Sequence, residues 1–361
     1  MNTGTLATTG LWRLAHSGRL SWGPRWYAGG IIGASAGNSD GNCEIIGCSF
    51  RGEIIGNGSG GIVGFTCGNG SGSCIINNCI TRGKIIGNRS GGIVGSHAGN
   101  RGYCEINDCD VIGDIIGGWC GGIVGENAGY KGECILFSNS YSGNINNEYV
   151  GGIVGMNCGY MGSCIIELCS VKDVIIDISG ICCGGIAGGN AGINGSCKLK
   201  RCDVSNIVIN GDESGGIVGG YAGKIDGKCM IENSRINGNI NSNYSGGIVG
   251  SNSGNNGLCE IENVEYIGNI NGIGCGGIVG GYAGYNGVLK LRTSYSSGLI
   301  IDDSIECGGL LGRYAGNKNG KVLVNECFSI MNINGSYNGG LIGGNGGNNF
   351  GFIVVQNIYY S

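Results

Sequence analysis

The chain has 361 residues, among them 83 Gly, 21 Cys and a single Pro, and its formal net charge is −4. Gly without a three-residue period excludes collagen, and 41% hydrophobic against 13% charged residues excludes a disordered chain. The small, scattered charge offers no basic field for nucleic acid, and no apolar run approaches the roughly 18 residues of a membrane helix. These features predict a soluble or surface-bound repeat protein without a nucleic-acid partner or transmembrane segment.

Residues 1–28 precede the first repeat and are expected to form an N-terminal cap, because the end of a stacked sheet otherwise exposes strand edges. Three of the four Trp residues lie there, and Leu11, Leu14, Gly18 and Leu20 keep the internal spacing of the later units, as a degenerate coil would. The segment lacks the continuous apolar core of a secretory signal. Localisation stays open, with the cell surface, the extracellular space or a virion favoured.

Residues 29–361 consist of tandem copies of one Gly-rich unit of about 31 residues. Each copy begins with a Gly-Gly pair, and later Gly positions recur in phase with it. Because Gly accepts positive φ and close backbone approach, we expect these positions to mark tight corners and contacts between coils. The pairs start at residues 29, 60, 91, 121, 151, 184, 215, 246, 276, 308 and 339.

Three apolar columns in each unit alternate with polar residues at period two, which is typical of short strands. The first column runs from Ile31 to Leu341, the second from Ile45 to Val355, and the third from Ile54 through Val208 to Ile333. One unit cannot close a core alone, but stacked units bury each column against its equivalents. The chain is therefore predicted to be all-β, a right-handed parallel β-solenoid (β-helix) of about eleven coils.

The segments Gly309–Gly312 and Gly340–Gly343, and nine further Gly-Ile-aliphatic-Gly variants such as Gly61–Gly64, resemble the GLUG repeat, which is named for Gly-Leu-hydrophobic-Gly. The Ala-Gly turn that follows and the closing Gly-Asn-Ile-Asn of 238–241 are similar to that family as well. The resemblance implies β-solenoid regions of surface proteins, including adhesins and proteins grouped with IgA-cleaving peptidases. It implies no catalytic residues. The many Cys residues depart from the family pattern.

Most Cys residues fall into two columns, which limits what they can be. The first column starts at Cys43 and ends in Leu289, Val322 and Ile353, as a small apolar core position would. The second starts at Cys48 and also holds Ser and Asn, which indicates a tight, partly polar corner. Because the two columns do not lose Cys together, buried thiols are favoured, with occasional disulfides and a metal site as alternatives.

No group of acidic or His residues interrupts the repeat at one level, as the carboxylates of a polysaccharide-cleaving β-helix would. Asp302–Asp303 and Asp212–Glu213 are placed in corner loops, Glu260, Glu262 and Glu265 share one coil, and the only two His residues are far apart. The segment 343–349 lacks the Asp that a calcium nonapeptide needs. We therefore expect no enzyme, cofactor or metal site.

The strongest candidate for a binding surface is a pair of Asn- and Tyr-rich columns that flank the Ala-Gly turn. The expected binding residues are Tyr221, Tyr282 and Tyr314 in one column and Tyr130, Tyr160 and Tyr285 in the other. Tyr and Asn together suit protein or sugar recognition, although Asn is also common at turns. The hypothesis is a non-enzymatic structural or adhesive protein that contacts surface proteins, glycans or copies of itself; the alternative is a carbohydrate-binding or polysaccharide-active β-helix.

Overall fold

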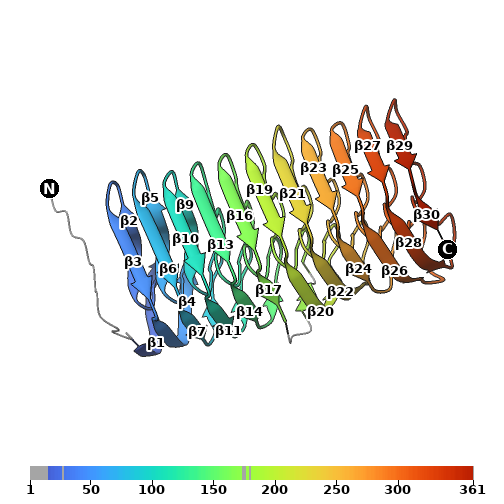
Figure 1. Ribbon diagram of the computed structural model, residues 1–361. Coiled ribbons are helices and arrows are strands. Elements are labelled where there is room, and N and C mark those ends of the chain that lie inside the picture. The colour runs from blue at the N-terminus through green and yellow to red at the C-terminus, as the bar shows by residue number, and fades with distance from the viewer. Residues whose placement is uncertain (1–14, 27, 173–175, 179, 361) are drawn as a thin grey trace.

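The computed structural model describes residues 15–26, 28–172, 176–178 and 180–360, and it contains strands, isolated bridges and turns but no helix over these residues. The chain winds into stacked coils of about 31 residues that form a parallel β-solenoid (Figure 1). With a strand spacing of about 4.8 Å, eleven stacked strands make a rod roughly 50 Å long. The all-β solenoid predicted from the repeat is confirmed.

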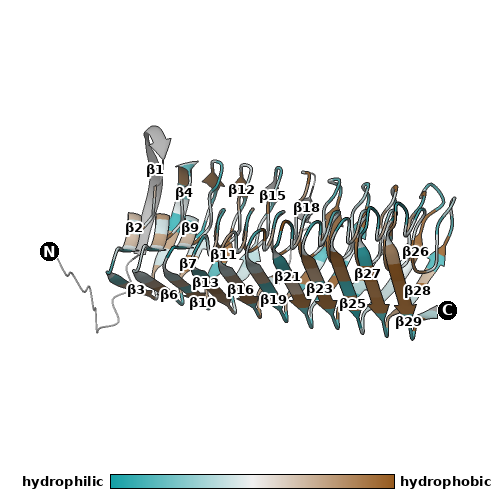
Figure 2. Cartoon of the chain, turned by 90° about the horizontal axis from the view of Figure 1, so that it is seen from above, coloured by the Kyte–Doolittle hydropathy of each residue, from teal (hydrophilic) through white to brown (hydrophobic). Residues whose placement is uncertain are grey.

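One face of the rod is an 11-stranded parallel sheet to which each repeat contributes a strand of five residues. In Figure 2 these strands lie in a row along one side of the rod. The strands are β3 (Asn42–Ile46), β6 (Ser73–Asn77), β10 (Tyr103–Asn107), β13 (Glu133–Phe137), β16 (Ser163–Glu167), β19 (Ser196–Lys200), β21 (Lys228–Glu232), β23 (Leu258–Glu262), β25 (Val288–Arg292), β27 (Lys321–Asn325) and β29 (Phe352–Gln356).

A second face is a 16-stranded sheet, in which several coils contribute two short strands. At the N-terminal end, β1 pairs in parallel with β4 and places Leu20 opposite Ile54. The strands are β1 (Ala15–Trp26), β4 (Ser49–Asn57), β7 (Ile80–Arg82), β8 (Ile85–Ile86), β11 (Asp110–Ile112), β12 (Ile115–Ile116), β14 (Ser140–Ser142), β15 (Ile145–Asn146), β17 (Ser170–Val171), β18 (Ile176–Ile178), β20 (Asp203–Ile209), β22 (Arg235–Ile240), β24 (Glu265–Ile267), β26 (Tyr295–Ile300), β28 (Phe328–Ile333) and β30 (Tyr359–Tyr360).

The Gly-Gly side of the coil forms a full sheet only near the N-terminus, where β2 (Ile32–Asn38), β5 (Val63–Asn69) and β9 (Val94–Asn100) pair in parallel. Farther along, the coils are joined there by isolated parallel bridges, such as those of Gly121 to Gly151 and Val124 to Val154. The prediction of three strands in every unit therefore holds for the first coils only. The inward column is still continuous, because Ile93 donates its backbone N–H to Ile123 and Ile123 to Ile153, and all three side chains are fully buried.

Two Gly positions show why the repeat needs this residue. Gly99 has φ +71°, and a Cβ built there would lie 2.1 Å from the carbonyl oxygen of Glu133 in the next coil. At Gly95 a Cβ would lie 2.1 Å from the carbonyl oxygen of Gly58. Both distances are too short for any side chain, so Gly95 and Gly99 allow the close approach between coils that was expected. Gly99 also adopts the left-handed conformation that favours Gly.

The third apolar column departs from the prediction at one coil. Ile209, and not Val208, pairs with Ile240, because the register between β20 and β22 shifts between Ser205 and Ile207. This bulge places one extra residue in β20, so the buried side chains of the strand end become Ile207 and Ile209 while Val208 turns outward. The column's preceding member, Ile175, lies outside the described residues.

The two Cys columns have different environments. Cys104, Cys134 and Cys164 face their equivalents inside the 11-stranded sheet and are buried, as an apolar column would be. In the second column the polar side chains bond backbone groups of neighbouring coils: the Cys109 Sγ accepts the Cys79 N–H at 3.4 Å, and the Asn139 Oδ1 accepts the Cys109 N–H at 3.0 Å. Cys, Ser and Asn share this column because all three can accept that hydrogen bond.

Nineteen of the 21 Cys residues are free thiols, and all but Cys43 of these are buried. Burial raises the pKa of Cys120 and of Cys169 to about 12, so these thiols are protonated and unreactive at neutral pH. One disulfide joins Cys67 to Cys74, with Cα atoms 5.5 Å apart. Cys67 stands where most units have the Ala of the turn, so the cross-link does not involve the two Cys columns together.

Candidate functional site

The residues that flank the Ala-Gly turn line one long surface, which we call the turn wall. It comprises the position of Asn127 and its equivalents, the position three residues later, and the position two residues before each Gly-Gly pair. At the first position every residue from Ser35 to Asn345 has a left-handed backbone, with φ between +55° for Asn252 and +65° for Tyr221. Asn adopts this conformation readily, so part of its enrichment on the wall is a backbone requirement.

Tyr has no such local preference, yet it occupies left-handed positions of the turn wall repeatedly. Tyr221, Tyr282 and Tyr314 have φ between +59° and +65° at the first position, and Tyr149 and Tyr244 have φ of +54° and +55° before the Gly-Gly pair. A bulky residue in this conformation carries a strain of about 1 kcal/mol or more. Asn, which neighbouring coils carry at this position, would adopt the same backbone conformation with less strain. The presence of Tyr therefore indicates a role for the phenol ring itself.

The C-terminal half of the turn wall carries an aromatic cluster, defined here as Tyr244, Tyr282, Tyr285 and Tyr314. The rings of Tyr282 and Tyr314 stack with centroids 4.9 Å apart, and Tyr244 and Tyr285 lie 5.8 and 6.1 Å from Tyr282. All four side chains are half-buried. The structure thus brings together three of the expected binding residues and adds Tyr244, which the sequence analysis did not select.

Arg313 fixes this C-terminal cluster. Its guanidinium lies 4.2 Å from the ring centroid of Tyr314 and 5.3 Å from that of Tyr244, and its Nη2 donates to the Tyr314 hydroxyl at 2.8 Å. Its Nη1 pairs with Glu306 at 2.7 Å, and Glu306 also accepts the Asn345 amide at 2.7 Å. Both members of the ion pair are only 18% exposed, so the cluster is held by a largely desolvated charge network.

A second aromatic group lies toward the N-terminus and consists of Phe65, His97, Tyr130 and Tyr160. The centroids of successive rings are 5.0, 5.8 and 5.4 Å apart along that series. Two more of the expected residues, Tyr130 and Tyr160, are therefore neighbours. Burial, and to a smaller extent the charge of Arg89, lowers the pKa of His97 to about 4, so its ring is neutral at physiological pH.

Tyr221 belongs to neither group. The Lys224 ammonium lies 4.2 Å from its ring centroid, and burial raises the pKa of Tyr221 to about 12. Glu213 nearby accepts from Ser251 at 3.0 Å. The six expected residues thus fall into a group of three, a pair and a single Tyr. The signal that would have found Tyr244 is the Trp or Tyr that stands two residues before several Gly-Gly pairs.

No family model, curated protein or solved structure matches this chain. Among the described residues, no helix is long and apolar enough to cross a membrane. The resemblance to the GLUG repeat accordingly stays a prediction.

The acidic residues that the sequence singles out do not form one site, although Glu260 and Glu262 both lie on the outer face of β23. Glu260 is on β23 of the 11-stranded sheet, where Lys228 and Lys290 each approach its carboxylate to 2.7 Å, whereas Glu265 is on β24 of the other sheet. Glu262, Asp302, Asp303 and Asp212 are exposed. Within the described ranges, no group of three His, Cys, Asp or Glu residues is arranged to hold a metal ion.

Asn side chains connect successive coils along the wall. The Asn69 amide donates to Asn38 at 2.7 Å and the Asn100 amide to Asn69 at 2.9 Å, at the second wall position. At the first position, Asn157 donates to Asn127 at 3.1 Å. These bonds run parallel to the rod axis and hold the turns in register, so the Asn residues support the surface from which the aromatic rings project.

Proposed function

We propose that the chain is a non-enzymatic rod that presents the turn wall to another surface, as a structural or adhesive protein does. The observation that carries the proposal is the C-terminal aromatic cluster, in which Tyr244, Tyr282 and Tyr314 are held together by Arg313. Rings that are already ordered lose little conformational entropy on contact, and Tyr offers a large amphipathic face. The backbone strain at these Tyr residues is accounted for by a role in contact.

The resemblance to GLUG repeats supports the same proposal, since it implies surface proteins and adhesins. Glycans and surface proteins are both suitable partners for Tyr, Asn and Arg side chains. The separation of Glu260 from Glu265, and the two Lys residues on Glu260, favour binding over cleavage for a carbohydrate partner. The proposed partner class is therefore a protein or glycan surface that the rod contacts along its length.

The test replaces Tyr221, Tyr282 and Tyr314 with Asn, the residue that other coils carry at this position and that tolerates its positive φ. Retention of the purified chain on immobilised glycans and on intact cell surfaces is measured, and at least about a tenfold loss is expected, since removing an aromatic contact typically costs more than 1 kcal/mol. Tyr295→Ser with Phe328→Ser, a stacked pair on the 16-stranded sheet, is the matched control. Undiminished retention by a folded triple variant would place the contact elsewhere.

A further inference from the structure

The outer face of the 11-stranded sheet is separate from the turn wall and has its own charge pattern. Side chains alternate along each strand, so the first, third and fifth residues point outward, as the burial of β10 and β21 illustrates. On the first five strands these positions hold four carboxylates and no Lys or Arg; the carboxylates are Glu44, Glu105, Glu133 and Glu167. Glu167 pairs with Arg201, which follows β19, so Glu44, Glu105 and Glu133 are the carboxylates of this half without an ion pair among the described residues.

The remaining six strands have the opposite balance. Their outward positions hold six cations and three carboxylates; the cations are Lys198, Lys200, Lys228, Lys290, Arg292 and Lys321. Lys198 pairs with Glu232 at 3.1 Å, and Lys228 and Lys290 share Glu260. Among the described residues, Lys200, Arg292 and Lys321 form no ion pair, so this half keeps a surplus of positive charge.

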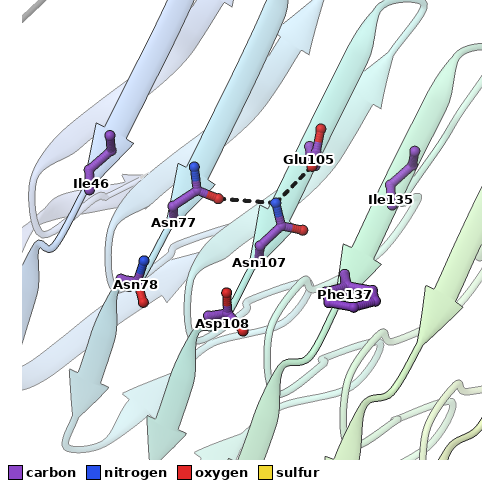
Figure 3. A pocket seen from close by; sticks show the side chains of 8 residues that line it. All are labelled: Ile46, Asn77, Asn78, Glu105, Asn107, Asp108, Ile135 and Phe137. Atoms are coloured by element: carbon purple, nitrogen blue, oxygen red, sulfur yellow. Dashed lines mark hydrogen bonds between the residues drawn. The ribbon is translucent and has the colours of Figure 1, made fainter.

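The acidic half contains a shallow groove of about 490 Å³ that crosses four coils (Figure 3). Ile46, Ile135 and Phe137 line it, and Ile46 and Phe137 are 51% and 38% exposed. Glu105 stands in the groove, where hydrogen bonds from the Tyr103 hydroxyl and the Asn107 amide lower the pKa of its carboxyl. The groove therefore offers a fixed, ionised carboxylate beside exposed apolar side chains.

The basic half offers the matching chemistry. Leu258, Val288 and Leu323 alternate there with the Lys and Arg side chains, and Phe352 at the end of the sheet is 58% exposed. A surface that combines apolar residues with uncompensated cations complements one that combines apolar residues with uncompensated carboxylates. The acidic half and the basic half lie at opposite ends of the same face. Two copies of this face therefore complement each other when one rod runs antiparallel to the other.

We propose that this face binds a second copy of the chain, with the two rods antiparallel and the acidic half of each against the basic half of the other. The two-fold axis lies between the faces and perpendicular to the rods. The contact between an acidic half and a basic half therefore occurs twice, as in an isologous dimer. A face about 50 Å long and 16 Å wide buries roughly 1,600 Å² in total, which is the size of a standard stable interface. The dimer leaves the turn wall free, so it is independent of the proposed function.

The test uses two charge-reversed variants whose association state is measured by sedimentation velocity at low salt. The acid-reversed variant carries Glu44→Lys, Glu105→Lys and Glu133→Lys, and the base-reversed variant carries Lys200→Glu, Arg292→Glu and Lys321→Glu. Each variant alone places like charges opposite each other, so its dimer dissociation constant should rise at least about tenfold. An equimolar mixture of the two should recover the wild-type affinity as a heterodimer, because reversed acidic halves then face reversed basic halves.

The control variant carries Asp110→Lys, Asp302→Lys and Asp303→Lys. It makes the same change in net charge as the acid-reversed variant, but away from the face, and should leave the dimer unchanged. Carbodiimide cross-linking of mixed unlabelled and ¹⁵N-labelled wild-type chains is a second measurement that needs no variant, and it should join Lys290 or Lys321 of one copy to Glu105 or Glu133 of the other. A wild-type chain that stays monomeric, a mixture that does not associate, or a dimer lost in the Tyr-to-Asn variant of the turn wall would overturn the proposal.

Discussion

At the scale of single residues, the left-handed positions explain most of the unusual composition outside the Gly columns. Residues such as Asn127, Asn157 and Asn190 occupy the first wall position because Asn tolerates positive φ and its amide can bond the next coil. His97 takes the same position with φ +59°. Its Nε2 accepts the Asn127 amide at 3.3 Å, which requires an unprotonated nitrogen.

This geometry makes His97 a source of acid sensitivity. The pKa of His97 is lowered to about 4 by burial and by Arg89, whereas an unfolded His titrates near 6.5, so the unfolded state takes up the proton first as the pH falls. Between pH 7 and 4 this should reduce the free energy of unfolding by up to about 3 kcal/mol. The His97→Asn variant should lose less stability over that range, because Asn does not titrate.

Urea unfolding of both chains at several pH values measures the effect, and the quantity of interest is their difference. Glu126, whose pKa is raised by burial, is present in both chains and cancels in that difference. Parallel pH profiles of the wild type and His97→Asn would contradict the assignment of the neutral ring.

At the scale of the repeated element, the two Cys columns show that one residue type serves two physical roles. Cys104 fills apolar space inside the 11-stranded sheet, while Cys109 accepts the backbone N–H of Cys79 and donates to the Asn107 carbonyl at 3.2 Å. The difference could be read from the replacements, which are aliphatic in the first column and Ser or Asn in much of the second. The sequence could not show that Cys109 bonds the N–H of Cys79 in the preceding coil, because that contact depends on how the coils stack.

The two roles predict different responses to the same substitution. Cys109→Val leaves the buried N–H of Cys79 without its acceptor and should lower the free energy of unfolding by about 1–3 kcal/mol. Cys104→Val makes the same small increase in side-chain size, in a column where a later coil carries Val322, and should cost less than about 1.5 kcal/mol. Cys109→Ser restores the acceptor and should be close to wild type. Equal losses for the two Val variants in chemical denaturation would argue against the polar corner.

At the scale of the whole molecule, each coil is stabilised by the coils with which it pairs, and among the described residues β29, at the edge of the 11-stranded sheet, pairs with β27 alone. Ile123 and Ile153 in the middle are fully buried, whereas Val355 in β29 is 41% exposed although it continues the same inward column as Leu136. In a one-dimensional stack such a coil opens first.

Amide hydrogen exchange should therefore be fastest in the last coil. Backbone amides of β29 are expected to exchange at least about 100-fold faster than those of β13 and β16, because local opening of an end coil exposes less apolar surface than opening in the middle. Peptide-resolved exchange monitored by mass spectrometry measures this gradient. Uniform protection from β13 to β29 would mean that something covers the end of the stack.

The repeat itself determined the fold class, the inward columns and the Gly corners, because a stacked coil repeats every local requirement in the sequence at a fixed period. Tertiary structure alone decided which side chains meet between coils. The bulge in β20, the Cys67–Cys74 disulfide, the Arg313 contact with Tyr244 and Tyr314, and the two charged halves of the 11-stranded sheet all depend on distances across the stack. Residues about 31 positions apart become neighbours there, and their register follows from packing and hydrogen bonds, which no single unit contains.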